Sequence, residues 1–319
     1  MSAGSQGGRS LDAAKIEAAY VGFHKTFNNR IGTAESVHKR IATVVETTDL
    51  VDRQVWLGAT PKMRRWIGDK VLNKIRAESH PIVTGPYEAS LEVPKHDILN
   101  DKLGMWRPKI NMIADAYDWA LDELAVGMLA AGVAGTALGT TYDGQNLIDT
   151  DHTASSAGGT SQTNHVAGAF TATTYNEAYT KLLKITDENG TPANTAGRRM
   201  TLLVGPTWRQ VARDIIDQQT QASGETNMDR GTADLIVTEW LAARTIKVNG
   251  VSVTITGNEW FLLPSNSTSI LIHVKRTPEF LAVEDGEYAF RTGKYLYGIE
   301  AEFGAAYGLW QEIASGPGS

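Results

Sequence analysis

The residues best suited to chemistry in this sequence are the acids and the imidazole of one short segment, TYDGQNLIDTDHT. The segment contains Asp143, Asp149, Asp151 and His152. Carboxylates and imidazoles are ligands for magnesium, manganese or zinc, so a metal-dependent hydrolase using Asp149, Asp151 and His152 is one hypothesis. The spacing matches no established ligand pattern, and Asp and His also form turns by bonding local amides. A structural role is the favoured interpretation, and metal or catalytic chemistry is the alternative.

Other signatures of catalysis are absent from the sequence. It contains no cysteine, no GxSxG nucleophile elbow and no glycine-rich phosphate loop followed by Lys-Ser or Lys-Thr. The segment Gly205-Pro206-Thr207 opens a helix after a strand, but its proline lacks the amide that an anion would need. The other histidines are scattered and give no second ligand set: His24, His38, His80, His96, His165 and His273. We therefore predict a protein without cofactor, metal or catalytic residues.

Composition points to a folded protein that is not a dedicated nucleic-acid binder. The chain has 319 residues, 42% of them hydrophobic, and a formal net charge of −6. Proteins that bind nucleic acid tightly are usually basic, although an acidic protein can still stand next to DNA. No run is long enough to cross a membrane, and residues 1–10 lack the apolar core of a signal peptide. We expect residues 1–10 to be disordered and the protein to stay in the cell that made it.

A long amphipathic helix over residues 103–132 is the element around which the fold is expected to form. Pro108 lies early in it, and Gly132 is placed to end it with a left-handed cap. Taken alone, this pattern favours an ordinary core helix. Its apolar stripe recurs every three or four positions and consists of Trp106, Ile110, Ile113, Tyr117, Leu121, Leu124 and Met128.

Two segments before this helix are candidates for contacts with other molecules. An early helix is expected to start at Ser10, with an apolar stripe that includes Phe23 and Phe27. Beyond it, two tryptophans bracket a turn, with two arginines beside the second. Buried tryptophans with solvated arginines are the favoured reading, and a contact patch is the alternative, because Trp and Arg often anchor interfaces. These candidate contacts are Trp56, Arg64, Arg65 and Trp66.

Residues 71–99 predict an extended two-stranded arm. Prolines exclude a long helix there, and apolar residues alternate with polar ones from Tyr87 onward. A hairpin alone is barely stable in water, so the arm is more plausible if a neighbouring molecule covers it. Tyr87, Glu88 and Glu92 are therefore further candidate inter-subunit contacts.

The remainder of the chain predicts a mixed α/β region. A helix is expected from Thr174, with a capping box to Glu177, ending at Gly190. Residues 235–240 are either a buried strand or a short helix, and Asn249-Gly250 predicts a hairpin. Further elements are expected as strands at 200–204, 260–263, 270–274 and within 288–310, and as a helix after Gly205-Pro206.

Three blocks of this sequence together resemble the major head subunit family of Mu-like phages, the T gene product family. They are WLGATPKMRRWIGDK at 56–70, YDGQNLIDTDHT at 142–153 and LYGIEAEFGAAYGLWQEIASG at 296–316. The blocks keep the family's order and cover nearly its full length. The resemblance implies an α+β capsid fold of the Hong Kong 97 (HK97) type.

The resemblance also implies a domain layout. It assigns 1–69 to an N-terminal arm, 70–101 to an extended β-hairpin loop, and 102–199 to the spine helix and peripheral domain. Residues 200–275 would form the axial domain, and 276–319 the C-terminal strands that return to the peripheral domain.

The function implied by the resemblance is that of a major capsid protein of a tailed phage or prophage. Such a protein assembles with itself into pentamers and hexamers of an icosahedral shell around double-stranded DNA. It is expected in the virion, and in the host cytoplasm during assembly, with portal and scaffold-protease proteins as partners. The alternative within the same fold is an encapsulin-like cellular compartment; neither reading involves a membrane.

Overall fold

The computed structural model describes residues 6–48, 51–57, 77–100, 102–135, 138–154, 159–187, 189–194, 197–220, 224–284 and 286–317. The chain forms two compact units. Unit 1 comprises Met1–Ser36, Gly85–Leu121 and Val274–Phe303, and unit 2 comprises Val37–Thr84, Asp122–His273 and Gly304–Ser319. This division does not test the predicted boundaries of arm, loop, peripheral and axial domains, which stay a prediction; the strand pairing expected within the loop is taken up below.

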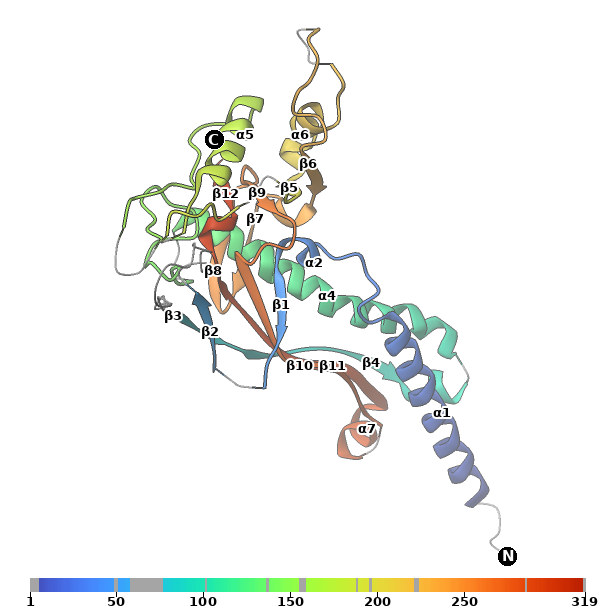
Figure 1. Cartoon of the computed structure of the whole chain (residues 1–319). Helices are drawn as coiled ribbons and strands as arrows, with labels where there is room; N and C mark the ends of the chain where they lie inside the picture. The colour runs from blue at the N-terminus through green and yellow to red at the C-terminus, as the bar shows by residue number, and fades with distance from the viewer. Residues whose placement is uncertain are drawn as a thin grey trace, which may run out of the picture. The chain divides into compact units, whose positions relative to one another are not determined.

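The predicted long helix is present as α4 (Leu103–Ala134), labelled in Figure 1. Its 32 residues correspond to about 48 Å at 1.5 Å per residue. The prediction that Gly132 caps it is wrong, because the helix continues to Ala134 and the left-handed glycine is Gly135, at φ +66°. A Cβ on Gly132 would lie 2.7 Å from Cβ of Leu147, so this glycine permits close packing rather than chain reversal.

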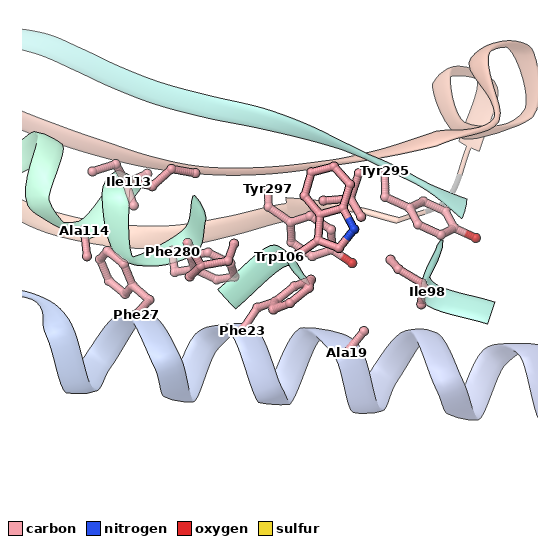
Figure 2. Packing of buried hydrophobic residues seen from close by; sticks show 13 residues of the cluster. Ala19, Phe23, Phe27, Ile98, Trp106, Ile113, Ala114, Phe280, Tyr295 and Tyr297 are labelled. Carbon is pink, nitrogen blue, oxygen red and sulfur yellow. The ribbon is translucent and has the colours of Figure 1, made fainter. Parts of the chain in front are cut away.

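Unit 1 packs two helices against one face of a sheet (Figure 2). Helix α1 (Gln6–Arg30) contributes Phe23 and Phe27, and α4 contributes Trp106 and Ile110 to the same core. Helix α1 begins at Gln6 rather than Ser10, so the predicted disorder of 1–10 is wrong from residue 6 onward. Each glycine in a helix costs only about 1 kcal/mol, which a helix anchored further along can absorb. Residues 1–5 lie outside the described part.

The strands of unit 1 come from three regions of the sequence. Strand β4 (Gly85–Pro94) pairs antiparallel with β11 (Lys294–Tyr307), in register from Lys294↔Pro94 to Phe303↔Gly85. The third strand is β10 (Ile270–Val283), and the sheet order is β1, β10, β11, β4, in which β1 (Thr43–Glu46) belongs to unit 2. Short helix α3 (Lys95–Leu99) follows β4, and α7 (Gly286–Thr292) joins β10 to β11.

The prediction that 71–99 forms a hairpin is therefore wrong. Strand β3 (Ala77–Val83) pairs with β2 (Val51–Leu57), in register from Val51↔Val83 to Leu57↔Ala77, and not with β4. Within the described residues β2 and β3 form a sheet of two strands only. The alternating pattern predicted strands correctly, but a period of two identifies a strand's faces and not its partner.

Unit 2 contains a four-stranded sheet with the order β12 (Ala314–Gly316), β9 (Trp260–Pro264), β5 (Met200–Val204), β6 (Ala233–Val237). The parallel pair β5–β6 is joined through η1 (Pro206–Trp208) and α6 (Arg209–Ile216), which confirms the predicted helix after Gly205-Pro206. Within 235–240, the strand alternative is confirmed up to Val237, and η2 (Glu239–Leu241) follows. The other described elements are α2 (His38–Ile41) and η3 (Trp310–Glu312).

Local turn chemistry explains two further elements of unit 2. Strands β7 (Arg244–Val248) and β8 (Val251–Ile255) confirm the predicted hairpin, with Asn249 and Gly250 both at positive φ. Helix α5 (Ala172–Lys184) begins two residues earlier than predicted, because Thr171 is its N-cap and Thr174, rather than Glu177, closes the capping box. The helix ends at Lys184, before the predicted end at Gly190.

Gly304 in β11 permits a close approach of two backbones. A Cβ at this position would lie 2.2 Å from the carbonyl oxygen of Val83, so one segment has to move. We expect Gly304→Ala to lower the free energy of unfolding by roughly 1–3 kcal/mol, measured by urea denaturation followed by circular dichroism. The matched control is Gly22→Ala in α1, where a Cβ meets open space and a gain of up to about 1 kcal/mol is expected. Equal effects at both glycines would contradict this reading.

Candidate functional site

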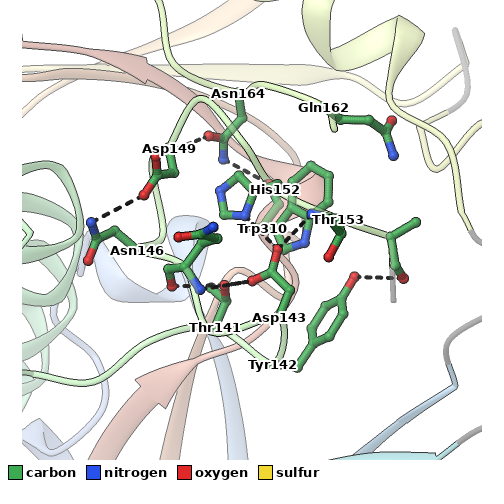
Figure 3. Close-up of polar contacts among 12 residues, drawn as sticks. Thr141, Tyr142, Asp143, Asn146, Asp149, His152, Thr153, Gln162, Asn164 and Trp310 are labelled. Atoms are coloured by element: carbon green, nitrogen blue, oxygen red, sulfur yellow. Dashed lines mark hydrogen bonds and ion pairs between the residues drawn. The ribbon is translucent and has the colours of Figure 1, made fainter. Parts of the chain in front are cut away.

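The segment with the candidate acids follows α4 and folds around a buried pair, His152 and Asp143 (Figure 3). Nδ1 of His152 donates to Oδ2 of Asp143 at 2.9 Å, and both side chains are fully buried. The backbone N–H of Thr153 donates to the same oxygen at 3.0 Å, and the Thr141 hydroxyl donates to Oδ1 at 2.5 Å. One carboxylate thus holds both ends of the segment.

The His152 ring stacks on Trp310, a residue more than 150 positions further along the chain. The ring centroids are 4.2 Å apart and the planes differ by 4°. Trp310 is fully buried and begins η3. The third resembling block therefore packs directly on the second, with the histidine as the contact surface.

Hydrogen bonds tie the same two blocks together around this stack. Nε2 of Gln311 donates to the hydroxyl of Tyr142, which donates to the carbonyl of Ala154 at 3.2 Å. Buried Asn164 donates to the carbonyls of Leu147 and Trp310 at 2.8 and 3.2 Å, as Figure 3 shows in part. We call this group the motif junction; it consists of Thr141, Tyr142, Asp143, His152, Asn164, Trp310 and Gln311.

The remaining acids do not join the buried pair. Asp149 accepts from Nδ2 of Asn146 at 3.2 Å and from the backbone N–H of Thr150 at 2.7 Å, as in a local turn, and Asp151 is exposed. Within the described residues no group of three or more His, Cys, Asp or Glu side chains is arranged to hold a metal ion. The hypothesis of a metal-dependent hydrolase on Asp149, Asp151 and His152 is not supported by this geometry, whereas the structural role is.

The charge of Asp143 stabilises the junction. Burial alone raises the pKa of Asp143, but hydrogen bonds from His152 and Thr141, the nearby imidazole charge and the amide of Thr153 outweigh burial and hold the pKa below its usual value. A carboxylate with a lowered folded-state pKa contributes stability that is present above its unfolded pKa of about 4. That contribution is lost as the pH falls through the folded-state pKa.

We expect Asp143→Asn to lower the free energy of unfolding by about 1–3 kcal/mol at neutral pH, because an amide cannot accept from all three donors described above. Below about pH 4 the difference from the unmodified chain should shrink, since the carboxylate of the unfolded chain then takes up a proton while the lowered pKa keeps the native one charged. Urea unfolding at pH 7 and pH 3 measures both effects, with Asp151→Asn as the exposed control. A difference that is the same at both pH values would show that the charge is irrelevant.

The predicted inter-subunit residues lie in several places. Tyr87 stacks on Phe303, with centroids 3.9 Å apart and planes at 6°, while one third of its surface stays exposed. Glu88 is exposed, and Glu92 accepts from Lys294 and Tyr288. The hydrogen bond from Lys294 is the main cause that lowers the pKa of Glu92.

Of the predicted tryptophan–arginine contacts at Trp56, Arg64, Arg65 and Trp66, only Trp56 lies within the described residues. Trp56 lies in β2, opposite Glu78 in register. Arg64, Arg65 and Trp66 lie outside the described residues, so the contact patch stays a prediction. No helix in the described part of the chain combines the length and apolarity needed to cross a bilayer.

The motif junction could not be assembled from the sequence. Asp143 and His152 are recognisable from the sequence as close neighbours, but nothing in it indicates that Asn164 belongs to the same group. The order of the resembling blocks was the one available signal that 142–153 and 296–316 belong together.

Comparison with known proteins shows which family this chain resembles. The family model of the Mu-like prophage major head subunit gpT matches residues 16–169 and 162–241, well over half of the chain. The chain is 37% identical over 137 residues to the Mu-like prophage FluMu major head subunit of Haemophilus influenzae, covering 43% of each protein. It is 27% identical over 139 residues to the major capsid protein of Escherichia phage Mu, covering 44% of each. The alignments thus span less than half the length of these curated relatives.

Solved structures show the same fold. The chain is similar to a subunit in the procapsid of bacteriophage JBD30, with a TM-score of 0.54 and 24% identity, over 95% of this chain and 74% of that one. This similarity confirms the predicted α+β capsid fold of the HK97 type. Because a family model covers most of its length and its fold agrees, the chain belongs to the Mu-like prophage major head subunit gpT family.

Proposed function

We propose that this chain is the major capsid protein of a tailed phage or prophage. It would assemble with itself into the pentamers and hexamers of an icosahedral shell that encloses double-stranded DNA. Membership of the major head subunit family carries the proposal, and the fold, which is similar to that of a phage procapsid subunit, supports it.

The two-stranded sheet of β2 and β3 supports assembly with identical copies. Two strands alone are marginally stable in water, and Pro81, opposite Arg53, removes one ladder donor. A neighbouring copy that covers these strands would bury further surface and so stabilise them. Contacts of this kind repeat around a shell, so each can be weak while the total is large. The candidate contacts remain Trp56, Arg64, Arg65, Trp66, Tyr87, Glu88 and Glu92.

The role proposed is packing and not catalysis, without a cofactor. The net charge of −6 fits a shell lining that does not hold DNA tightly, since phosphate contacts dominate nucleic-acid affinity. Portal and scaffold-protease proteins would be the assembly partners. The protein would end in the virion and pass through the host cytoplasm during assembly.

Gradient sedimentation and negative-stain electron microscopy of the expressed chain, alone and with a scaffold, test the proposal. We expect closed shells, or rings of five or six subunits. Shells that carry an enzyme as cargo would favour the encapsulin-like alternative instead. A chain that stays monomeric under every assembly condition would contradict both.

A further inference from the structure

Helix α7 carries the most exposed large apolar side chain among the described residues, Phe290, with 93% of its surface exposed. The helix lies at the end of the paired strands β10 and β11 (Figure 1). Next to Phe290, the side chain of Arg291 is 75% exposed and makes only a loose ion pair of 3.7 Å with Glu287. Helix α7 thus exposes the Phe290 ring to solvent beside the guanidinium of Arg291, which has only this weak partner.

The same unit has a hollow on the sheet face that points away from its core. The hollow has a volume of about 150 Å³ and includes Leu281, Val283 and Gly298 in its wall. Leu281 and Val283 are both exposed. Gly298 allows β11 to approach β4 closely at the hollow, because a Cβ there would lie 2.9 Å from the carbonyl oxygen of Ala89.

The wall of the hollow also carries two carboxylates that face each other. Glu88 on β4 is directly opposite Glu300 on β11, and like charges in this position are destabilising. Arg276 pairs with Glu300 at 3.0 Å. Within the described residues the carboxylate of Glu88 makes no hydrogen bond or ion pair, so a cation from a second molecule would relieve the repulsion.

We propose that α7 of one copy docks in this hollow on a second copy. Phe290 would pack against Leu281 and Val283, and Arg291 would pair with Glu88. The inference rests on the proposed self-assembly and specifies one of its contacts. The occupant is a second copy because the apolar and charged features of α7 match those of the hollow, and because Phe290 is too exposed to fill the hollow of its own chain.

This contact uses different surfaces on the two copies. Each subunit would offer one α7 and one hollow, so every contact leaves a further α7 and a further hollow free. Such heterologous contacts close into rings when the rotation permits. A contact of this kind therefore suits a shell of many copies and not an isolated dimer.

The absence of cysteine from the sequence permits a direct test. Chains with Phe290→Cys are co-assembled with chains of another mass that carry Leu281→Cys, and the particles are oxidised. We expect a disulfide-linked pair containing one chain of each type, which cannot form within a single chain. The matched control replaces Leu281→Cys by Val21→Cys, another exposed position outside the hollow. Shells without the mixed pair would overturn this inference and leave the proposed function intact.

A charge exchange provides the second test. Arg291→Glu and Glu88→Arg alone should each weaken subunit association roughly tenfold, which corresponds to about 1.4 kcal/mol. The double variant should restore association, and Lys247→Glu, an exposed change in β7, should have no effect. Single variants that assemble like the unmodified chain, or a double variant without rescue, would overturn the proposed contact. If the unmodified chain never assembles, the proposed function fails as well.

Discussion

Trp310→Ala is expected to lower the free energy of unfolding by about 3–5 kcal/mol, one of the two largest effects expected of a single change. The side chain is fully buried and stacks on His152. Its loss leaves a cavity and removes the surface against which the 142–153 segment is ordered. Since typical domains are stable by only about 5–15 kcal/mol, a loss of this size also predicts poor soluble yield.

Urea denaturation followed by far-ultraviolet circular dichroism measures this loss without relying on tryptophan fluorescence. The matched control is Trp119→Ala in α4, where nearly half of the tryptophan surface is exposed, and a change below about 1 kcal/mol is expected. A Trp310→Ala variant as stable as the Trp119→Ala variant would show that the motif junction is not a centre of stability.

Phe23→Ala is expected to cost about 3–5 kcal/mol as well, but in unit 1. Phe23 is 1% exposed and meets the ring of Tyr297 edge-on, with centroids 5.1 Å apart. It belongs to the apolar stripe of α1 that packs on the sheet and on α4 (Figure 2). Truncation should therefore release α1 from the rest of the unit.

Amide hydrogen exchange of α1 checks this prediction, because a released helix loses protection along its length. Val21→Ala is the control two positions away, on the exposed face of the same helix, and it should leave protection unchanged. If Phe23→Ala left α1 as protected as the control did, the helix would be held by other contacts.

Periodicity predicted the elements and their faces well. The stripe from Trp106 to Met128 identified α4, and the alternation after Tyr87 separated the half-buried Ala89 and Leu91 from the exposed Glu88 and Glu92. These patterns follow from the geometry of a single helix or strand. They need no knowledge of what lies opposite.

Partners distant in sequence could not be predicted in this way. Strand β4 pairs with residues 294–303, some two hundred positions later, and Trp310 meets His152 across a similar gap. Gly132 misled for the same reason, because its role is to admit Leu147. A glycine can indicate either a turn or a close approach of two segments. Only the residue that packs against it in the fold shows which of the two applies.

The candidate site shows the same division. The sequence marked Asp143 and His152 as chemically capable, and the structure places them in a buried, hydrogen-bonded support. Asp and His are catalytic in many proteins, but in this chain Asp143 and His152 hold the 142–153 segment against Trp310. This outcome fits a protein whose proposed function depends on shape and contact.

Cryo-electron microscopy of particles formed by the purified chain tests the central claim most directly. The account predicts closed shells built of pentamers and hexamers, in which β2 and β3 of each subunit are covered by a neighbouring copy. Monomers alone, or particles in which β2 and β3 contact only their own chain, would contradict it.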